Sequence, residues 1–313
     1  MKITVIGTGY VGLIQGVCLA ELGNTVSCVD IDTDKIESLR NGRSPIYEPG
    51  LEKLIRKNIK AGRLFFTPSL AEAMTGCSVV FIAVGTPASP DGSADLRQIE
   101  QAATEIAQHI SQPIIIAIKS TVPPGTCRKV RETVATRYAG DFAVLANPEF
   151  LREGSAVADF LKPDRIVIGG SEPAASQLAE LYQPLKAPVL ITSAETAEVI
   201  KYASNSFLAT QISFINSIAH LCEKVGADVT EVAEGMKLDP RIGRRALLGA
   251  GLGYGGSCLP KDVNALIHTT RQHGIDFPVL EAVQHTNSHQ YARFLEKVLA
   301  TIGPEIKGKI VTL

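Results

Sequence analysis

The chain has 313 residues, which suits about two domains of ordinary size. Hydrophobic residues make up 45% of it and charged residues 20%, as is typical of a globular protein with a sizeable core. The formal net charge of −1 gives no electrostatic argument for nucleic acid or an anionic membrane surface as a partner. No apolar run approaches the ~18 residues that a transmembrane helix needs, so we expect no membrane span.

The six cysteines occur singly, without a CxxC pair. Such spacing is typical of reduced thiols, and we therefore expect a cytoplasmic protein. The first residues lead directly into a strand and a glycine turn, without the longer apolar stretch of a signal peptide.

Up to about residue 193, short apolar runs alternate with helical patterns. The runs predict strands at Ile3–Ile6, Val26–Val29, Arg63–Phe66, Val79–Val84, Ile114–Ile118, Ala143–Leu145, Arg165–Ile168 and Val189–Ile191. Helical patterns between them include Val11–Leu22, Leu51–Lys60, Leu96–His109 and Thr126–Arg137. Unbroken apolar strands separated by helices predict a Rossmann-like, doubly wound, mostly parallel α/β sheet with helices on both faces. In such a sheet, ligands bind at the carboxyl ends of the strands.

The character of the chain changes at about Ala194. The segment Ala194–Val225 contains no proline or glycine and has apolar residues at helical spacing, which predicts one connecting helix of roughly 45 Å. Further helices are predicted at Val229–Met236, Lys261–His273 and Pro278–Ile302. We therefore expect a Rossmann-like α/β domain at 1–193, a helical central domain at 194–303 and, at 304–313, the first strand of another α/β unit.

The first motif is Gly7-x-Gly9-x-x-Gly12, which follows a predicted strand and opens a predicted helix. Asp30 ends the next strand, 18 residues after Gly12. In this context the glycines let backbone N–H groups at a helix N-terminus meet a pyrophosphate. Asp30 would accept hydrogen bonds from the adenosine ribose and repel a 2′-phosphate, which favours NAD over NADP.

Two further turns with hydroxyl side chains end predicted strands, Val84–Pro87 and Ser120–Thr126. Each alone would be an ordinary loop more often than not. Because both lie at the same sheet edge as the glycine motif, they favour cofactor contacts, with Thr86 and Thr121 as the candidates.

Two pairs of polar residues spaced four apart are candidates for a catalytic cleft, although their pattern is less specific than the glycine motif. Glu149 and Glu153 would share one face if their segment were helical, and they are either a solvated surface pair or groups that handle a proton or a water. Lys201 and Asn205 have the same spacing, and they become interesting only if their helix faces Cys258. His285 and His289 lack a third ligand, so we expect no metal.

The segment Gly249–Asp262, GAGLGYGGSCLPKD, is the most informative stretch of the chain. Its five glycines within eight residues give a backbone that can approach a ligand closely. Cys258 follows directly, with charged neighbours near enough to tune its thiol. This pattern favours a nucleophile over a core residue.

Together these motifs resemble the UDP-glucose/GDP-mannose dehydrogenase family over the whole chain. The resemblance rests on GTGYVG, SPIYEPGLEKL, VGTPASPDGSADL, KSTVPPGT, NPEFLREGSAVADF, KYASNSFLATQISFIN, DPRIG and GGSCLPKD, in this order. The segment around Tyr47–Leu54 and the run PDGSADL look more like the members that act on UDP-glucose.

The resemblance implies an NAD-dependent four-electron oxidation of the C6 alcohol of UDP-glucose to UDP-glucuronate, as used in polysaccharide biosynthesis. An aldehyde cannot readily give up a second hydride, whereas its adduct with the Cys258 thiolate can. The product of that step is a thioester, which water hydrolyses. Sister activities on GDP-mannose or a UDP-N-acetylhexosamine, and a two-electron hydroxyacid dehydrogenase in which Cys258 is incidental, stay open.

The resemblance also implies residue roles. Cys258 is the nucleophile, Lys201 and Asn205 stabilise the oxyanion, Asp262 holds Lys201 or a water, and Glu149 is the acid/base, with Thr121 near the nicotinamide. The cofactor would contact Gly7, Gly9, Tyr10, Val11, Gly12, Asp30, Lys35, Thr86, Thr121 and Glu153. The sugar nucleotide would contact Glu149, Phe150, Leu151, Arg152, Lys201, Asn205, Arg241, Gly249, Gly251, Gly253, Tyr254 and Gly255. Arg241 would reach the neighbouring subunit's site in a homodimer built on the long helix.

Family members carry a third, UDP-binding domain after the central one, and this sequence ends at Leu313, within what would be the first strand of that domain. We therefore expect weaker UDP-sugar binding with NAD binding largely intact. An inactive NAD-binding, dimerising fragment is the alternative that this expectation leaves open.

Overall fold

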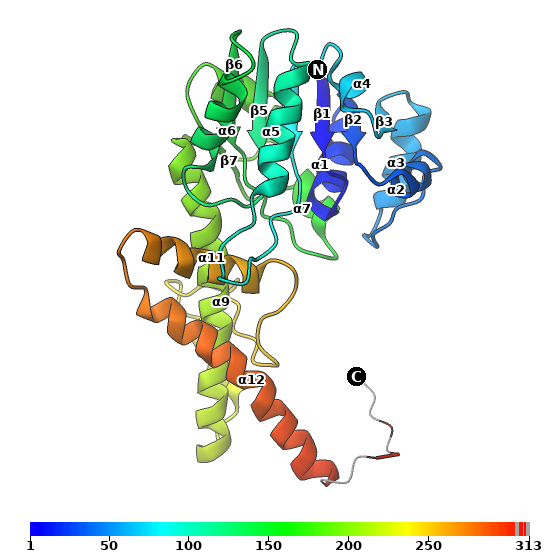
Figure 1. Ribbon diagram of the computed structural model, residues 1–313. Coiled ribbons are helices and arrows are strands. Elements are labelled where there is room, and N and C mark those ends of the chain that lie inside the picture. The colour runs from blue at the N-terminus through cyan, green and yellow to red at the C-terminus, as the bar shows by residue number, and fades with distance from the viewer. Residues whose placement is uncertain (304–306, 309, 311–313) are drawn as a thin grey trace. The chain divides into compact units, whose positions relative to one another are not determined.

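The computed structural model describes residues 1–303, 307–308 and 310, and they form two compact units (Figure 1). The first unit comprises residues 1–87 and 94–201, and the second comprises residues 88–93 and the described residues from Tyr202 onward. Helix α9 (Ala194–Val225) therefore contributes residues to both units. The strand expected within 304–313 falls largely outside the described residues.

An eight-stranded sheet forms the centre of the first unit, with the strand order β3-β2-β1-β4-β5-β6-β7-β8. All pairs of neighbours are parallel except β6 and β7. The strands are β1 (Lys2–Ile6), β2 (Thr25–Val29), β3 (Leu64–Thr67), β4 (Val79–Ile82), β5 (Ile114–Ile118), β6 (Phe142–Ala146), β7 (Ile166–Gly169) and β8 (Val189–Thr192). The predicted doubly wound, mostly parallel sheet is confirmed.

Helices cover both faces of this sheet, which is why its inner strands are apolar throughout. In β5, Ile115 and Ala117 join one buried cluster, whereas Ile114, Ile116 and Ile118 join the other. Residues of α1 (Tyr10–Glu21), α3 (Leu51–Lys60), α7 (Ala156–Leu161) and α8 (Ala174–Glu180) belong to the first cluster. Residues of α4 (Leu70–Met74), α5 (Arg97–His109) and α6 (Thr126–Ala135) belong to the second. The remaining helices of this unit are α2 (Thr33–Arg40) and the short 3₁₀ helix η1 (Gln183–Leu185).

The strand order places a ligand-binding edge in this unit. Strand β1 pairs with β2 on one side and β4 on the other, so the chain reverses its direction of winding at β1. The crevice outside the carboxyl ends of strands at such a switch point is where α/β sheets bind nucleotides. The loops after β1, β2, β4 and β5 leave the sheet at this same edge because these strands are parallel.

The second unit is helical. Besides α9 it contains α10 (Val229–Lys237), α11 (Leu259–Gln272) and α12 (Pro278–Ile302). The bounds predicted for the long helix and for the last helix are confirmed. Two small buried clusters hold this unit together, one of them around Ala209, Val263 and Leu280 of α9, α11 and α12. Among the described residues, every helix is too short or too polar to span a bilayer.

Candidate active site

The three glycines of the first turn serve different purposes. A Cβ atom on Gly7 would lie 2.6 Å from the Ala83 carbonyl oxygen, and Gly7 has a φ of 94° that favours glycine. A Cβ atom on Gly12 would lie 2.0 Å from the Gly7 carbonyl oxygen, so this glycine lets α1 approach the strand. A Cβ atom on Gly9 would meet nothing within 4 Å. The surrounding chain therefore gives no packing reason for a glycine at position 9, and the space beside it is open.

Asp30 is fixed at the carboxyl end of β2 as an ionised acceptor. Its Oδ2 atom accepts hydrogen bonds from the Thr8 backbone N–H at 2.9 Å and the Thr8 hydroxyl at 2.6 Å, and it pairs with Lys35 Nζ at 3.0 Å. Burial alone would raise the pKa of the Asp30 carboxyl, but these hydrogen bonds hold it below its usual value. An ionised carboxylate here suits ribose hydroxyls and repels a phosphate.

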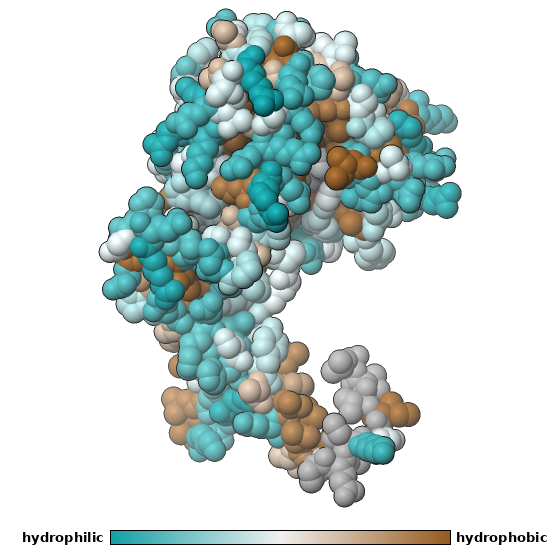
Figure 2. All heavy atoms as spheres, viewed as in Figure 1, coloured by the Kyte–Doolittle hydropathy of each residue, from teal (hydrophilic) through white to brown (hydrophobic). Residues whose placement is uncertain are grey.

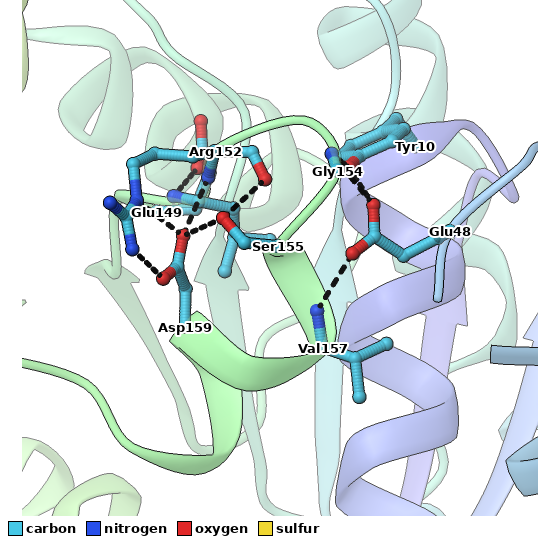
Figure 3. A network of polar contacts seen from close by, with 9 residues as sticks. Tyr10, Glu48, Glu149, Arg152, Gly154, Ser155, Val157 and Asp159 are labelled. Carbon is cyan, nitrogen blue, oxygen red and sulfur yellow. Dashed lines mark hydrogen bonds and ion pairs between the residues drawn. The ribbon is translucent and has the colours of Figure 1, made fainter. Parts of the chain in front are cut away.

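A buried glutamate that the sequence reasoning missed, Glu48, ties α1 to the loop after β6 (Figure 3). Its Oε2 atom accepts hydrogen bonds from the Tyr10 hydroxyl at 2.5 Å and the Gly154 N–H at 3.0 Å. Its Oε1 atom faces the Val157 N–H at 3.5 Å. This carboxylate therefore holds the segment that carries Glu149 and Glu153 against the first helix of the glycine motif.

The loops after β4 and β5 are bound to each other and to α9. The Thr86 hydroxyl donates to the Thr121 carbonyl at 2.9 Å. Glu198 of α9 caps α6: its carboxylate accepts the backbone N–H groups of Gly125 at 2.6 Å and Cys127 at 2.8 Å. These contacts fix the position of Thr121, and Glu198 was not predicted.

Glu149 and Lys201 form a buried ion pair. Lys201 Nζ lies 2.9 Å from Glu149 Oε1, and both side chains are at most 6% exposed. Burial alone would raise the pKa of the Glu149 carboxyl, but the charge of Lys201 and the Leu151 backbone N–H, 2.5 Å from Oε2, hold it below its usual value. The pair is therefore a carboxylate facing an ammonium group.

The segment around Glu149 differs from one expectation. It is irregular up to α7, so Glu149 and Glu153 do not share a helical face, and Glu153 is exposed in a turn. Phe150 is stacked under the Arg165 guanidinium, with 3.8 Å between the guanidinium carbon and the ring centroid. Arg152 is exposed and pairs with Asp159 at 2.6 Å (Figure 3).

The second unit carries the thiol. Cys258 is the N-cap residue of α11 and is half-buried, whereas the other five cysteines are buried. The amino end of a helix favours negative charge, as a thiolate requires. One turn into α11, the fully buried Asp262 accepts hydrogen bonds from Asn205 Nδ2 at 2.6 Å and from Lys261 Nζ at 2.5 Å. The expected hold of Asp262 on Lys201 or a water stays a prediction.

The glycine-rich loop before Cys258 is held by side chains of α9 and α12. The Gly251 N–H donates to Asn216 Oδ1 at 2.8 Å, and the Tyr254 N–H donates to Asn287 Oδ1 at 2.7 Å. A Cβ atom on Gly249 or Gly251 would meet nothing within 4 Å, as at Gly9. Arg241 is exposed and pairs with Asp239 at 2.6 Å.

The predicted site residues thus fall into two groups. The first unit holds Glu149–Arg152, Glu153, Lys201, Thr86, Thr121 and the residues of the glycine motif with Asp30 and Lys35. The second unit holds Cys258, Asp262, Asn205, Arg241 and the glycine-rich loop. Lys201 and Asn205 lie one turn apart on α9, so this helix carries a member of each group.

Comparison with known proteins gives consistent matches over the chain. Residues 1–186 match the family model described as the UDP-glucose/GDP-mannose dehydrogenase family, NAD binding domain, and residues 195–289 match the central domain of that family. UDP-glucose 6-dehydrogenase TuaD of Bacillus subtilis is 50% identical over 100% of the chain and 68% of its own length. UDP-glucose 6-dehydrogenase of Pseudomonas aeruginosa is 46% identical over 99% of the chain and 69% of its length.

Solved structures agree with this assignment. A UDP-glucose dehydrogenase from the archaeon Pyrobaculum islandicum matches 95% of the chain and 71% of its own chain, with a TM-score of 0.92 and 46% identity. A GDP-mannose dehydrogenase from Pseudomonas aeruginosa matches 96% of the chain and 71% of its own, with a TM-score of 0.74 and 35% identity.

Proposed function

Because the chain belongs to the UDP-glucose/GDP-mannose dehydrogenase family, we propose that it oxidises the C6 alcohol of UDP-glucose to the carboxylate of UDP-glucuronate. The reaction consumes two NAD⁺ and one water and yields two NADH and three protons. The observation that carries this proposal is the identity of 46–50% to relatives named UDP-glucose 6-dehydrogenase, over at least 99% of the chain.

The residues of the first unit fit NAD. The open position at Gly9 allows a pyrophosphate to approach the backbone, and the ionised Asp30 with Lys35 suits the adenosine ribose. Tyr10, Val11 and Gly12 begin α1 and would hold the pyrophosphate, and the loop residues Thr86, Thr121 and Glu153 would contact the nicotinamide end. When bound, NAD⁺ accepts one hydride in each of the two oxidations.

The thiol makes the second oxidation possible. The Cys258 thiolate adds to the C6 aldehyde, so that a C–S bond forms and the carbonyl electron pair moves to oxygen as an alkoxide. Lys201 and Asn205 stabilise that oxyanion with an ammonium and an amide group. Asp262 accepts a hydrogen bond from the Asn205 amide and so orients that amide.

Loss of hydride from this adduct gives a thioester, and its hydrolysis returns the thiol. Water adds to the thioester carbon, the C–S bond breaks, and Cys258 leaves as a thiolate. Glu149 accepts the proton from the attacking water as general base, for which its carboxylate form is needed.

In this proposal the sugar nucleotide contacts nine further residues. They are Phe150, Leu151, Arg152, Arg241, Gly249, Gly251, Gly253, Tyr254 and Gly255. Arg241 acts in the neighbouring subunit of a homodimer built on α9. A cytoplasmic location, and the absence of nucleic acid and membranes as partners, stay predictions.

Two measurements test the proposal. NADH formed per UDP-glucose consumed should be two, and protein quenched during turnover should carry a sugar-nucleotide adduct on the Cys258 peptide. Cys258→Ser should form no acid and carry no adduct. Cys222→Ser, at a buried cysteine of the same unit, should form the acid and carry the adduct on Cys258. One NADH per substrate, or acid formation by Cys258→Ser, would exclude the covalent route. A panel including GDP-mannose and UDP-N-acetylhexosamines identifies the preferred substrate.

A further inference from the structure

A second lysine lies beside the Glu149–Lys201 pair and has no role in the function proposed above. Lys119 follows β5, and only 6% of it is exposed. Its Nζ atom lies 3.3 Å from Asn147 Oδ1 and 3.4 Å from the Pro148 carbonyl oxygen. Both acceptors belong to the segment that leads directly into Glu149.

Buried side chains hold the acceptors of Lys119 in place. The Tyr182 hydroxyl donates to Asn147 Oδ1 at 2.5 Å and accepts from Gln15 Nε2 at 2.9 Å. Asn147 Nδ2 donates to the Val167 carbonyl at 2.9 Å, which links the segment to β7. The ammonium group of Lys119 also lies over the Tyr182 ring, 5.9 Å from its centroid. Lys119 therefore has a defined place in a buried hydrogen-bond network.

Two cations lower the pKa of the Glu149 carboxyl, Lys201 and Lys119, and a third cation is stacked on the neighbouring residue Phe150. Lys201 projects from α9, Lys119 follows β5, and Arg165, before β7, is stacked on Phe150. Glu198, the acidic residue of α9 nearest to Lys201 in the sequence, accepts hydrogen bonds from backbone N–H groups at the amino end of α6. Burial, together with the charge of Lys201, lowers the pKa of Lys119 to about 8, while Glu149 opposes this shift. Lys119 thus stays mostly protonated at neutral pH.

The proposed reaction creates a difficulty that Lys119 resolves. When Lys201 turns to a substrate oxyanion, Glu149 loses its closest cation while still buried, and an unpaired buried carboxylate tends to take up a proton. A protonated Glu149 could not act as a base. We propose that Lys119 is a positioning residue that keeps Glu149 ionised and in place while Lys201 is bound to substrate, an inference that rests on the proposed function.

A titration without substrate isolates this role. Lys201→Met removes the closest cation, and infrared spectra of protein with ¹³C-labelled glutamate, minus those of the same protein with Glu149→Gln, report whether Glu149 is protonated. In Lys201→Met, Glu149 should still be ionised at pH 7. In Lys201→Met with Lys119→Gln, its protonation should move up by about one pH unit or more, because the second cation is gone. Lys201→Met with Lys119→Arg should titrate like Lys201→Met.

The control is Lys201→Met with Lys129→Gln, since Lys129 is an exposed lysine of α6. If Lys119→Gln and Lys129→Gln leave the same Glu149 titration, the proposed role is wrong. If Lys119→Gln does not fold, as judged by circular dichroism, Lys119→Met, which has an uncharged side chain of similar length, takes its place.

Activity gives an independent reading. In the single variant Lys119→Gln, the acid limb of the kcat–pH profile should move to higher pH with KM for UDP-glucose within twofold of wild type. An unchanged acid limb would contradict the proposal. If the chain oxidised no sugar nucleotide, only the proposed function would be wrong. The effect of Lys119 on Glu149 could still be measured, because the infrared titration needs no turnover.

Discussion

At the scale of single residues, the six thiols occupy two kinds of environment. Burial raises the pKa of Cys18 and Cys28 to about 12, and it also raises the pKa of Cys77 and Cys127. A thiol must lose its proton to react, so these cysteines are both shielded and protonated at neutral pH. Cys258 alone is half-buried, and it lies at the amino end of α11.

This contrast predicts selective alkylation. Iodoacetamide at pH 8 should modify Cys258 at least ~10-fold faster than any other cysteine, because the thiolate is the reacting form. Peptide mapping by mass spectrometry over time measures the rates. In urea, all six cysteines should react at similar rates, which serves as the control. Comparable rates for Cys258 and Cys222 in the folded protein would show that the thiol is not activated.

The sequence revealed some of these residues and not others, for physical reasons. Cys258 stood out because a glycine-rich loop precedes it, and Asp30 because it ends a strand after a glycine motif. The pairing of Glu149 with Lys201 joins residues 52 positions apart, and only the tertiary fold brings them together. One sequence feature could have singled out Lys119: it is a single charged residue directly after the apolar run Ile114–Ile118.

At the scale of elements, long regular patterns were predictable and short helices were not. All eight predicted strands are present because each apolar run ends at glycine, proline or polar residues. The helices α2, α4, α7 and α8 were missed, and none exceeds eight residues. So short a helix shows little periodicity, and its stability comes from tertiary contacts such as those of Val157 and Phe160 in α7.

In the turn from β1 to α1, substitutions of different glycines should separate an effect on packing from an effect on ligand binding. Gly9 and Gly12 belong to the same motif, but an added methyl group has space only at Gly9. Gly9→Ala should leave the free energy of unfolding within about 0.5 kcal/mol of wild type and lower NAD affinity at least ~10-fold, because the Cβ atom would occupy the path of the pyrophosphate. Gly12→Ala should destabilise the fold by about 3 kcal/mol.

The chain contains no tryptophan, so unfolding in urea is best followed by circular dichroism, and NAD binding by calorimetry. Asp34→Asn, at an exposed residue of α2, is a control that should change neither quantity. Full NAD affinity in Gly9→Ala would mean that the pyrophosphate lies elsewhere.

At the scale of the whole molecule, the exposed face of α9 favours association between copies of the chain. Phe207, Phe214 and Leu221 are 62%, 49% and 57% exposed and follow one another at intervals of seven residues. This interval is close to two helical turns, so the three side chains form one apolar stripe. Figure 2 shows hydrophobic side chains on the surface around the last turns of α9 and on α12, where Tyr291, Phe294 and Leu295 are also exposed. A large exposed apolar patch is typical of a protein interface.

Replacing the middle residue of this stripe tests the homodimer. Wild type should have twice the chain mass of 33.4 kDa by light scattering, and Phe214→Glu should have the mass of one chain. In a twofold interface, each copy of Phe214→Glu would bring a charge to the apolar stripe. Each copy would also lose the roughly 1.5–3 kcal/mol that a buried phenylalanine side chain contributes to association. Lys224→Glu, at an exposed lysine of the same helix, should remain dimeric. NAD binding by Phe214→Glu should equal that of wild type, because the glycine motif and Asp30 belong to the first unit. A wild-type mass of one chain at about 50 µM, a dissociation constant that corresponds to roughly 6 kcal/mol, would exclude a dimer of useful affinity.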